Sequence, residues 1–145
     1  MIISSIKLIL IIAVHFWTAI FLYGFDIMCT YQKGTIELIN GNLTGEDAIS
    51  TISEHSEVTY GQILASGPNS RGEFMFTNEN LFRLGTSSVA NWKNRNELWL
   101  HSGSVLFCSP NRSELSVSSQ ISSASFTGTG TFIVESTQNG GFKFI

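Results

Sequence analysis

His101-Ser102-Gly103-Ser104 is the part of the chain that comes closest to a catalytic arrangement of histidine and serine. A histidine that takes the proton of a serine hydroxyl can activate it as a nucleophile. The tetrapeptide lacks the Gly-x-Ser-x-Gly pattern of a nucleophile elbow, and Gly103 is better explained as a bend between two strands. Because no nucleophile, base and oxyanion site can be named together, we expect neither enzymatic activity nor a small-molecule substrate.

Metal binding is the second chemistry to consider. The histidines at positions 15, 55 and 101 are far apart and lack the ligand spacing of a zinc site. The acidic residues do not form the Asp-x-Asp-x-Asp pattern of a calcium loop. We therefore expect no metal and no cofactor.

Two tryptophans, Trp92 and Trp99, bracket the polar segment 93–97. Trp99 alternates with Leu98 and Leu100, so its ring can face outward while its neighbours face a core. We expect one tryptophan of the pair to pack in that core. An exposed tryptophan on a rigid β scaffold suits protein binding, so Trp92 and Trp99 are the candidate partner-binding residues.

An apolar run without charged side chains extends from Leu8 to Phe25. Its 18 residues would span roughly 27 Å as a helix, close to the ~30 Å hydrocarbon thickness of a bilayer. Lys7 is expected to stay on the cytoplasmic side. We therefore expect residues 1–28 to be a signal peptide or an uncleaved signal anchor, with residues 8–25 in the inner membrane in the second case.

Cys29, directly after this segment, allows a lipoprotein as a third alternative, although bulky Ile27 and Met28 stand where a lipobox has small residues. Cys29 and Cys108 could pair in an oxidising compartment, and their spacing leaves both states open. The chain has 8 basic and 11 acidic residues and a formal net charge of −3. Without a cluster of basic residues, we expect no nucleic-acid binding.

Beyond residue 28, short apolar or alternating runs are separated by Gly, Asn, Ser and Pro, which predicts an all-β domain. The one helical candidate is Leu43–Glu54, where Thr44 and Asp47 are spaced like a capping box. The Ser-rich stretch 109–125 could be a linker, but the alternation in 114–117 favours an edge strand. The predicted strands are Thr35–Ile39, Val58–Leu64, Glu73–Phe76, Leu81–Leu84, Glu97–Leu100, Val105–Cys108, Glu114–Val117 and Thr131–Glu135, and 91–96 is predicted as a turn.

Four motifs follow one another between residues 65 and 134. A Gly-Pro-Asn-Ser-Arg turn (67–71) leads into an apolar strand, and a second short strand ends in Arg-Leu-Gly (83–85). A strand pair with a glycine bend (98–107) and a run containing Gly-Thr and Phe-Ile-Val (124–134) come next. In this order and spacing, residues 58–145 resemble the FecR domain, the exported module of bacterial cell-surface signalling regulators.

The resemblance implies a FecR-like β domain of solenoid or sandwich type over 58–145, preceded by a leading strand and variable linker over 29–57. It implies a non-enzymatic module, in the periplasm or cell envelope, that binds an envelope protein and relays a signal. The alternative is a structural or glycan-binding envelope module without a signalling role. Only six residues precede Lys7, so the cytoplasmic anti-sigma segment of classical regulators has no counterpart and we expect no sigma-factor contact.

Four glycines each stand between an apolar and a polar run: Gly67, Gly85, Gly103 and Gly128. We expect them to be structural turn positions that need a positive φ or a close backbone approach.

Two arginines, Arg71 and Arg83, each border an apolar strand. We expect both to donate hydrogen bonds to turn carbonyls or to a carboxylate such as Glu73 or Glu79. Binding of an anionic ligand is the alternative.

Overall fold

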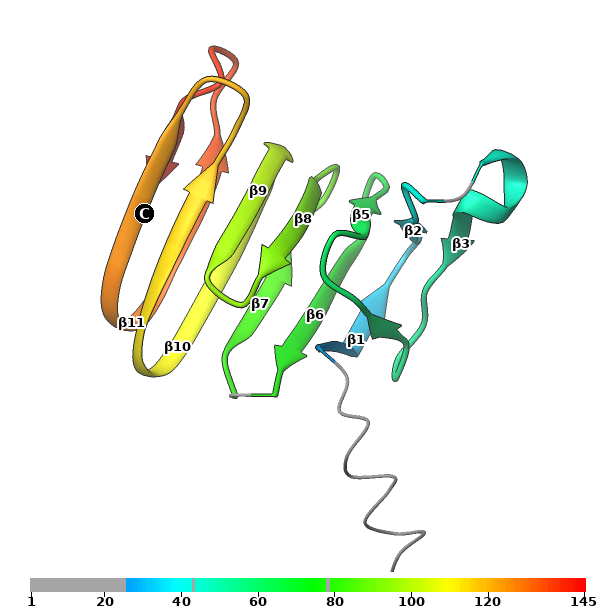
Figure 1. The fold of residues 1–145 in the computed structure, drawn as a ribbon, viewed down its shortest axis with the longest axis horizontal. Coiled ribbons are helices and arrows are strands. Elements are labelled where there is room, and N and C mark those ends of the chain that lie inside the picture. The colour runs from blue at the N-terminus through cyan, green and yellow to red at the C-terminus, as the bar shows by residue number, and fades with distance from the viewer. Residues whose placement is uncertain (1–25, 43, 78) are drawn as a thin grey trace, which may run out of the picture.

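The computed structural model describes residues 26–42, 44–77 and 79–145. These residues form one 12-stranded sheet and a single short 3₁₀ helix (Figure 1), which confirms the all-β prediction. The predicted membrane helix, Leu8–Phe25, lies outside the described residues. The elements are β1 (Ile27–Lys33), β2 (Ile36–Ile39), η1 (Gly45–Ala48), β3 (Ile49–Thr51), β4 (Glu57–Val58), β5 (Ile63–Ser66), β6 (Arg71–Phe76), β7 (Leu81–Leu84), β8 (Val89–Asn94), β9 (Glu97–Ser102), β10 (Ser104–Ser118), β11 (Ser123–Ser136) and β12 (Phe142–Phe144).

The sheet curls into two layers, because its strand order runs β3-β2-β5-β8-β9-β10-β7-β6-β1-β4. The long strand β10 joins them: residues 116–118 pair with β9, and residues 105–108 pair with β7. Layer A thus holds β3, β2, β5, β8 and β9 with the second half of β10. Layer B holds β4, β1, β6 and β7 with the first half of β10. β11 follows β10 through both layers, and β12 pairs with the end of β11 in layer B.

The core between the layers is built around Trp92 of β8, which is 2% exposed. Its ring lies 4.8 Å from that of Phe76, 5.2 Å from Phe82 and 5.8 Å from Phe107, all on layer B. Phe82 also stacks on Phe74 at 4.7 Å. Burying an aromatic side chain stabilises the fold by about 1.5–3 kcal/mol, so this cluster contributes to holding layer A onto layer B, together with the other buried apolar residues of the core.

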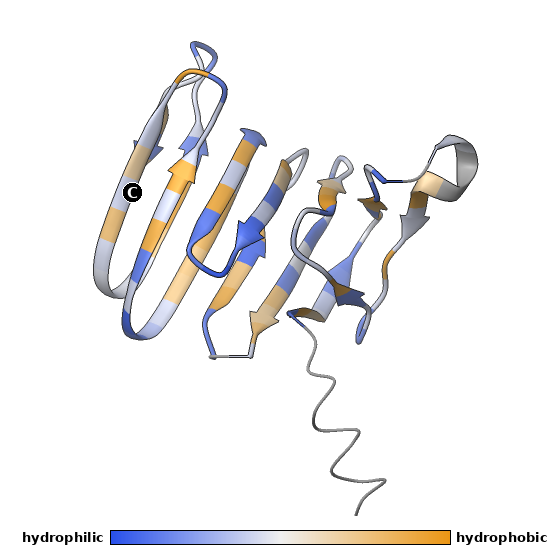
Figure 2. Ribbon diagram, viewed as in Figure 1, coloured by the Kyte–Doolittle hydropathy of each residue, from blue (hydrophilic) through white to orange (hydrophobic). Residues whose placement is uncertain are grey.

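Side chains alternate between core and solvent along the strands, as period-two geometry requires. In β6 and in the first four residues of β8 and β9, every second residue is buried, and the bands of Figure 2 follow this alternation. One face of each layer is therefore apolar and inward, and the other carries the polar residues.

Two turns of the same design connect the layers, Gly67–Ser70 between β5 and β6 and Gly85–Ser88 between β7 and β8. The serine that closes each turn accepts a hydrogen bond of 2.9 Å from a neighbouring backbone N–H, that of Thr35 in the first turn and that of Ser104 in the second. The glycine N–H that opens each turn donates back to the carbonyl of the same neighbour, at 3.0 Å and 2.9 Å. This repeat satisfies backbone groups that the corners would leave buried and unpaired.

The four predicted turn glycines differ in their backbone φ angle and in the space available for a Cβ atom. Gly103 has a φ of +79°, and a Cβ there would lie 2.6 Å from the Cα of Ser88. At Gly85 a Cβ would lie 3.1 Å from the carbonyl oxygen of Ser104. Gly128, at the corner of β11, has a φ of +148°. The expectation is wrong for Gly67, whose φ is not positive and whose Cβ would meet its nearest atom at an ordinary 3.4 Å.

Three local predictions are wrong. The predicted helix Leu43–Glu54 is replaced by η1 and β3, because β-branched residues at 49–52 favour a strand. The predicted strand Val58–Leu64 is interrupted at 59–62, where Gly61 has a φ of +90°. The predicted turn at 91–96 is mostly strand β8.

The ends of other elements also differ from the sequence pattern. β1 begins at Ile27, which is fully buried and lies opposite Phe76, so Ile27 and Met28 belong to the sheet rather than to the targeting segment 1–28. The predicted strands 105–108 and 114–117 are the two halves of β10. The second half is not an edge strand, since it pairs with both β9 and β11.

Candidate functional site: the outer face of β8 and β9

The outward-facing residues of β8 and β9 form the candidate site. Leu98 and Leu100 of β9 are fully buried, so Trp99 between them points to the outer face of layer A. Its pairing partners are Asn91 on β8 and Ser118 on β10. The predicted outward position of Trp99 therefore agrees with the structure.

The ring of Trp99 is partly exposed and is covered by two side chains. The Lys93 ammonium lies 4.1 Å from the ring centroid, and the His101 ring lies 5.9 Å away. Lys93 also pairs with Glu97 at 3.8 Å. An exposed cation–π contact contributes about 0.5–1 kcal/mol and an exposed ion pair about 0–1 kcal/mol, so this cover is held weakly.

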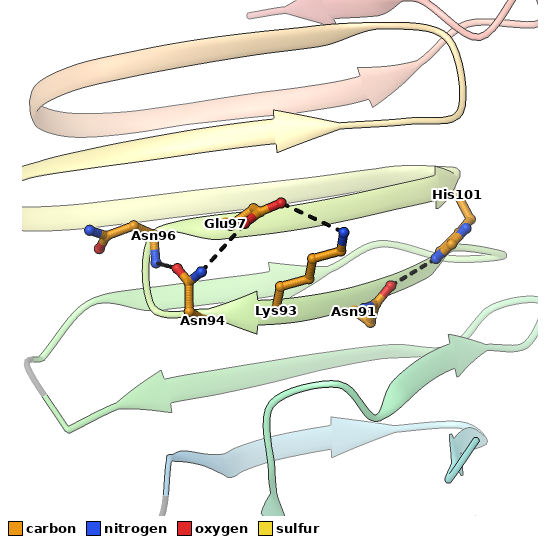
Figure 3. A network of polar contacts seen from close by, with 6 residues as sticks. All are labelled: Asn91, Lys93, Asn94, Asn96, Glu97 and His101. Carbon is orange, nitrogen blue, oxygen red and sulfur yellow. Dashed lines mark hydrogen bonds and ion pairs between the residues drawn. The ribbon is translucent and has the colours of Figure 1, made fainter. Parts of the chain in front are cut away.

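A set of polar contacts connects side chains of β8, of β9 and of the turn between them (Figure 3). His101 Nε2 and Asn91 Oδ1 are 2.8 Å apart, across the two strands. At the β8–β9 turn, Asn94 Nδ2 donates to Glu97 Oε2 at 3.4 Å, and the Asn96 backbone N–H donates to Asn94 Oδ1 at 2.9 Å. These contacts fix the two strand ends on either side of Trp99.

Trp92, the other predicted binding residue, is in the core and cannot contact a partner. Its position on β8 is opposite Leu98, on the inner face. The sequence pattern predicted that one tryptophan would be a core residue, and Trp92 is that residue. The indole Nε1 atoms of Trp92 and Trp99 are both buried without a hydrogen-bond partner among the described residues.

A cavity of about 420 Å³ lies beside His101. Its other walls come from the β10–β11 turn and the β11–β12 turn, which supply Gln120, Gln138 and Asn139. The two turns are joined by a hydrogen bond of 2.8 Å from Ser119 Oγ to the Gly140 carbonyl. The lining contains amide and hydroxyl groups, the His101 ring and the Ile121 side chain, and no Asp, Glu, Lys or Arg.

The two arginines take different partners. Arg83 pairs with Glu73 at 2.5 Å, across β6 and β7, which is one of the partners that the sequence pattern left open. Arg71 lies 5.9 Å from the centroid of the Tyr31 ring. Arg83 thus has a structural role on the outer face of layer B.

Both cysteines are free thiols, on opposite faces of layer B. Cys29 is fully buried in β1, and burial raises the pKa of its thiol above the ordinary value of 9.0, with a further contribution from Glu54. Cys108 is partly exposed, and its neighbours Val105 and Phe107 on β10 face the core.

Other chemistry in the described chain is sparse. His101 bonds to Asn91 rather than to a serine, and no three His, Cys, Asp or Glu residues in the described ranges are grouped as metal ligands. Within those ranges, no helix is long and apolar enough to cross a membrane. No family model matches this chain, and neither the curated proteins nor the solved structures yielded a match.

The sequence pattern missed the residues around Trp99, namely Asn91, Lys93 and Glu97. All three fall in or next to segment 91–96, whose asparagines predicted a turn. The signal that could have found them is the alternation Ala90, Trp92 against Asn91, Lys93, which has period two.

Proposed function

We propose that this protein is a non-enzymatic protein-binding module of the bacterial cell envelope, of the FecR type, which binds its partner through the outer face of β8 and β9. The observation that carries the proposal is Trp99, an outward aromatic ring on a rigid strand between polar groups. Interface hot spots are enriched in tryptophan and are surrounded by polar residues that exclude water.

The weak cover over Trp99 suits such a role. Lys93 has 46% of its side chain exposed, so its ammonium can leave the ring for about 0.5–1 kcal/mol. A partner that replaces Lys93 on the ring would bury the indole, and a carboxylate on that partner could pair with the displaced ammonium. An apolar surface with an acidic rim is therefore the complementary partner.

Export and signalling rest on sequence features. The uncharged run Leu8–Phe25 supports membrane targeting, and the ordered motifs over 58–145 support a FecR-type domain. A reporter that is active only after export, fused after Ile145, is expected to be active. Activity of a cytoplasm-only reporter at the same position would contradict the envelope assignment.

Capture from bacterial envelope extract tests the binding face. The full chain in detergent is expected to retain a partner that Trp99→Ala no longer retains. Arg112→Ala, an exposed change on β10, is the matched control and is expected to retain it. Equal capture by wild type and Trp99→Ala would refute binding through this face.

Glycan binding is a second candidate function, favoured by the cavity beside His101. Amide groups such as Gln138 and Asn139 can exchange hydrogen bonds with sugar hydroxyls, and about 420 Å³ lies within the usual range of ligand sites. The test is titration with chitotetraose and with maltotetraose in a detergent without sugar groups. Binding that Gln138→Ala weakens supports this function, and no binding of either oligosaccharide counts against it.

A further inference from the structure

The two ends of the curled sheet are closed differently. At the end formed by β3 and β4, residues 52–56 cross from one layer to the other. The Ile52 N–H bonds to Ile36 of layer A at 3.0 Å, and the His55 N–H bonds to Cys29 of layer B at 2.8 Å. Ile52 is only 4% exposed. This segment covers the core with polar residues on its outer side, as the cap of a stacked β structure does.

At the opposite end, formed by β11 and β12 (left in Figure 1), the core is not covered by any described segment. Phe144 lies opposite Val134, which is fully buried, so its ring is on the inner side of layer B. Phe144 is nevertheless 44% exposed. Phe126 lies opposite buried Leu115 in layer A and is also partly exposed.

Exposed apolar side chains are concentrated at this uncovered end. Among the described residues, the large hydrophobic side chains that are exposed are Ile49, Ile121, Phe144 and Ile145. Phe144 and Ile145 belong to β12 or directly follow it, and Ile121, in the turn before β11, also lines the cavity beside His101. Scattered exposed apolar residues are ordinary, but a group at one site marks an interaction surface.

The last strand of layer A also has a free edge. β11 pairs with β10 along one side, and β12 with the residue after it covers its other side only at residues 133–136. The straight segment Ser123–Thr127 therefore presents backbone groups that no other described strand pairs with. Residues 123–131 contain no charge and no proline, the features with which proteins usually protect an edge strand.

We propose that this end binds the same end of a second copy of the chain, with β11 pairing antiparallel to β11 of the partner about a two-fold axis. Stacking of this end on the β3–β4 end of a second copy is disfavoured, because residues 52–56 already cover the β3–β4 end. Self-pairing of Ser123–Thr127 places no like charges opposite each other, which would destabilise cross-strand pairs. The exposed rings of Phe144 from both copies are buried in the same interface.

The two-fold symmetry predicts which residue of β11 lies opposite the same residue of the second copy. Gly128 and Gly130, with φ values of +148° and +132°, bend the strand and limit straight pairing to 123–127. Full overlap of this segment places Ser125 opposite Ser125 of the second copy. Directly opposed Cα atoms in an antiparallel pair are about 4.5–5.5 Å apart, within the range that a disulfide can bridge.

Disulfide cross-linking of the full chain in detergent tests this interface. In a Cys108→Ser background, Ser125→Cys is expected to form covalent dimers on oxidation. Thr51→Cys, an exposed position on β3 at the other end of layer A, is the matched control and is expected to stay monomeric. Equal cross-linking at both positions, or none at Ser125→Cys, would overturn the proposal.

A charge exchange gives a second readout that does not depend on oxidation. Ser125→Lys is expected to weaken dimerisation by roughly fivefold, the size of one unfavourable cross-strand pair, in sedimentation measurements. An equimolar mixture of Ser125→Lys and Ser125→Asp is expected to restore it. A wild-type chain that remains monomeric at tens of micromolar, or a mixture no tighter than Ser125→Lys alone, would refute self-association. Both readouts are independent of partner binding through Trp99.

Discussion

The inner and outer faces of the β8–β9 hairpin use the same kind of residue for opposite purposes. Trp92 on the inner face contacts three phenylalanines and is 2% exposed. Trp99, on the neighbouring strand, points outward and is covered by the exposed side chains of Lys93 and His101. One residue holds the layers together, and the other is available to a partner. Strand period alone decides which is which.

A substitution on the inner face of the hairpin should cause the largest loss of stability. Trp92→Ala is expected to lower the free energy of unfolding by about 3–5 kcal/mol, the usual cost of removing a buried large aromatic side chain. Urea denaturation followed by circular dichroism measures it. Trp99→Ala is the matched variant, and a loss for it as large as that for Trp92→Ala would break the distinction between the two faces.

The next largest loss of stability is expected at the turns that connect the two layers. Gly103→Ala is expected to destabilise the protein by about 1–3 kcal/mol, because it places a side chain at positive φ against Ser88. Gly67→Ala is its control and is expected to change stability by less than about 1 kcal/mol, since its φ is not positive. Similar denaturation midpoints for the two variants would show that Gly103 is not constrained.

This pair of glycines shows where the sequence was and was not informative. Composition and alternation predicted the all-β fold and allowed an outward Trp99, and Glu73 was one of several partners expected for Arg83. Local residue type could not separate Gly103 from Gly67, because the difference comes from Ser88, which the fold brings close from the turn between β7 and β8. The turn prediction for asparagine-rich β8 failed for a similar reason. Layer B buries Trp92, and this burial outweighs the turn preference of the neighbouring asparagines.

Alkaline pH should destabilise the fold through Cys29, which is buried in β1 of layer B. Burial, and then Glu54, raise the pKa of this thiol above 9.0, so the folded state holds the proton more tightly than the unfolded state. The resulting stability is fully present below pH ~9 and is lost as the pH rises through the raised pKa. Cys29→Ala is expected to flatten the alkaline decline in unfolding free energy.

Tyr60 also contributes to the alkaline loss of stability, so Cys29→Ala alone should not remove it completely. Burial, and then Asp26, raise the pKa of its phenol, so the same sign applies and Tyr60→Phe is expected to remove a further part of the slope. An alkaline slope unchanged in Cys29→Ala would show that this thiol is not protonated more strongly in the folded state.

The smallest expected effect on stability is on the outer face. Lys93→Ala removes the cation–π contact and the pair with Glu97, so it is expected to cost about 0.5–1 kcal/mol. Acrylamide should quench Trp99 fluorescence more strongly in this variant, because the ring is uncovered. Arg95→Ala, an exposed change in the adjacent turn, is the control. Unchanged quenching in Lys93→Ala would show that the ammonium does not shield the ring.

Site-specific photo-cross-linking in cells tests the binding face most directly. With benzoylphenylalanine in place of Trp99, irradiation is expected to attach an envelope protein covalently. The same amino acid in place of Glu37, an exposed residue on the outer face of β2 in the same layer, should give no such adduct. Adducts at position 37 equal to those at position 99, or none at position 99, would contradict partner binding through the outer face of β8 and β9.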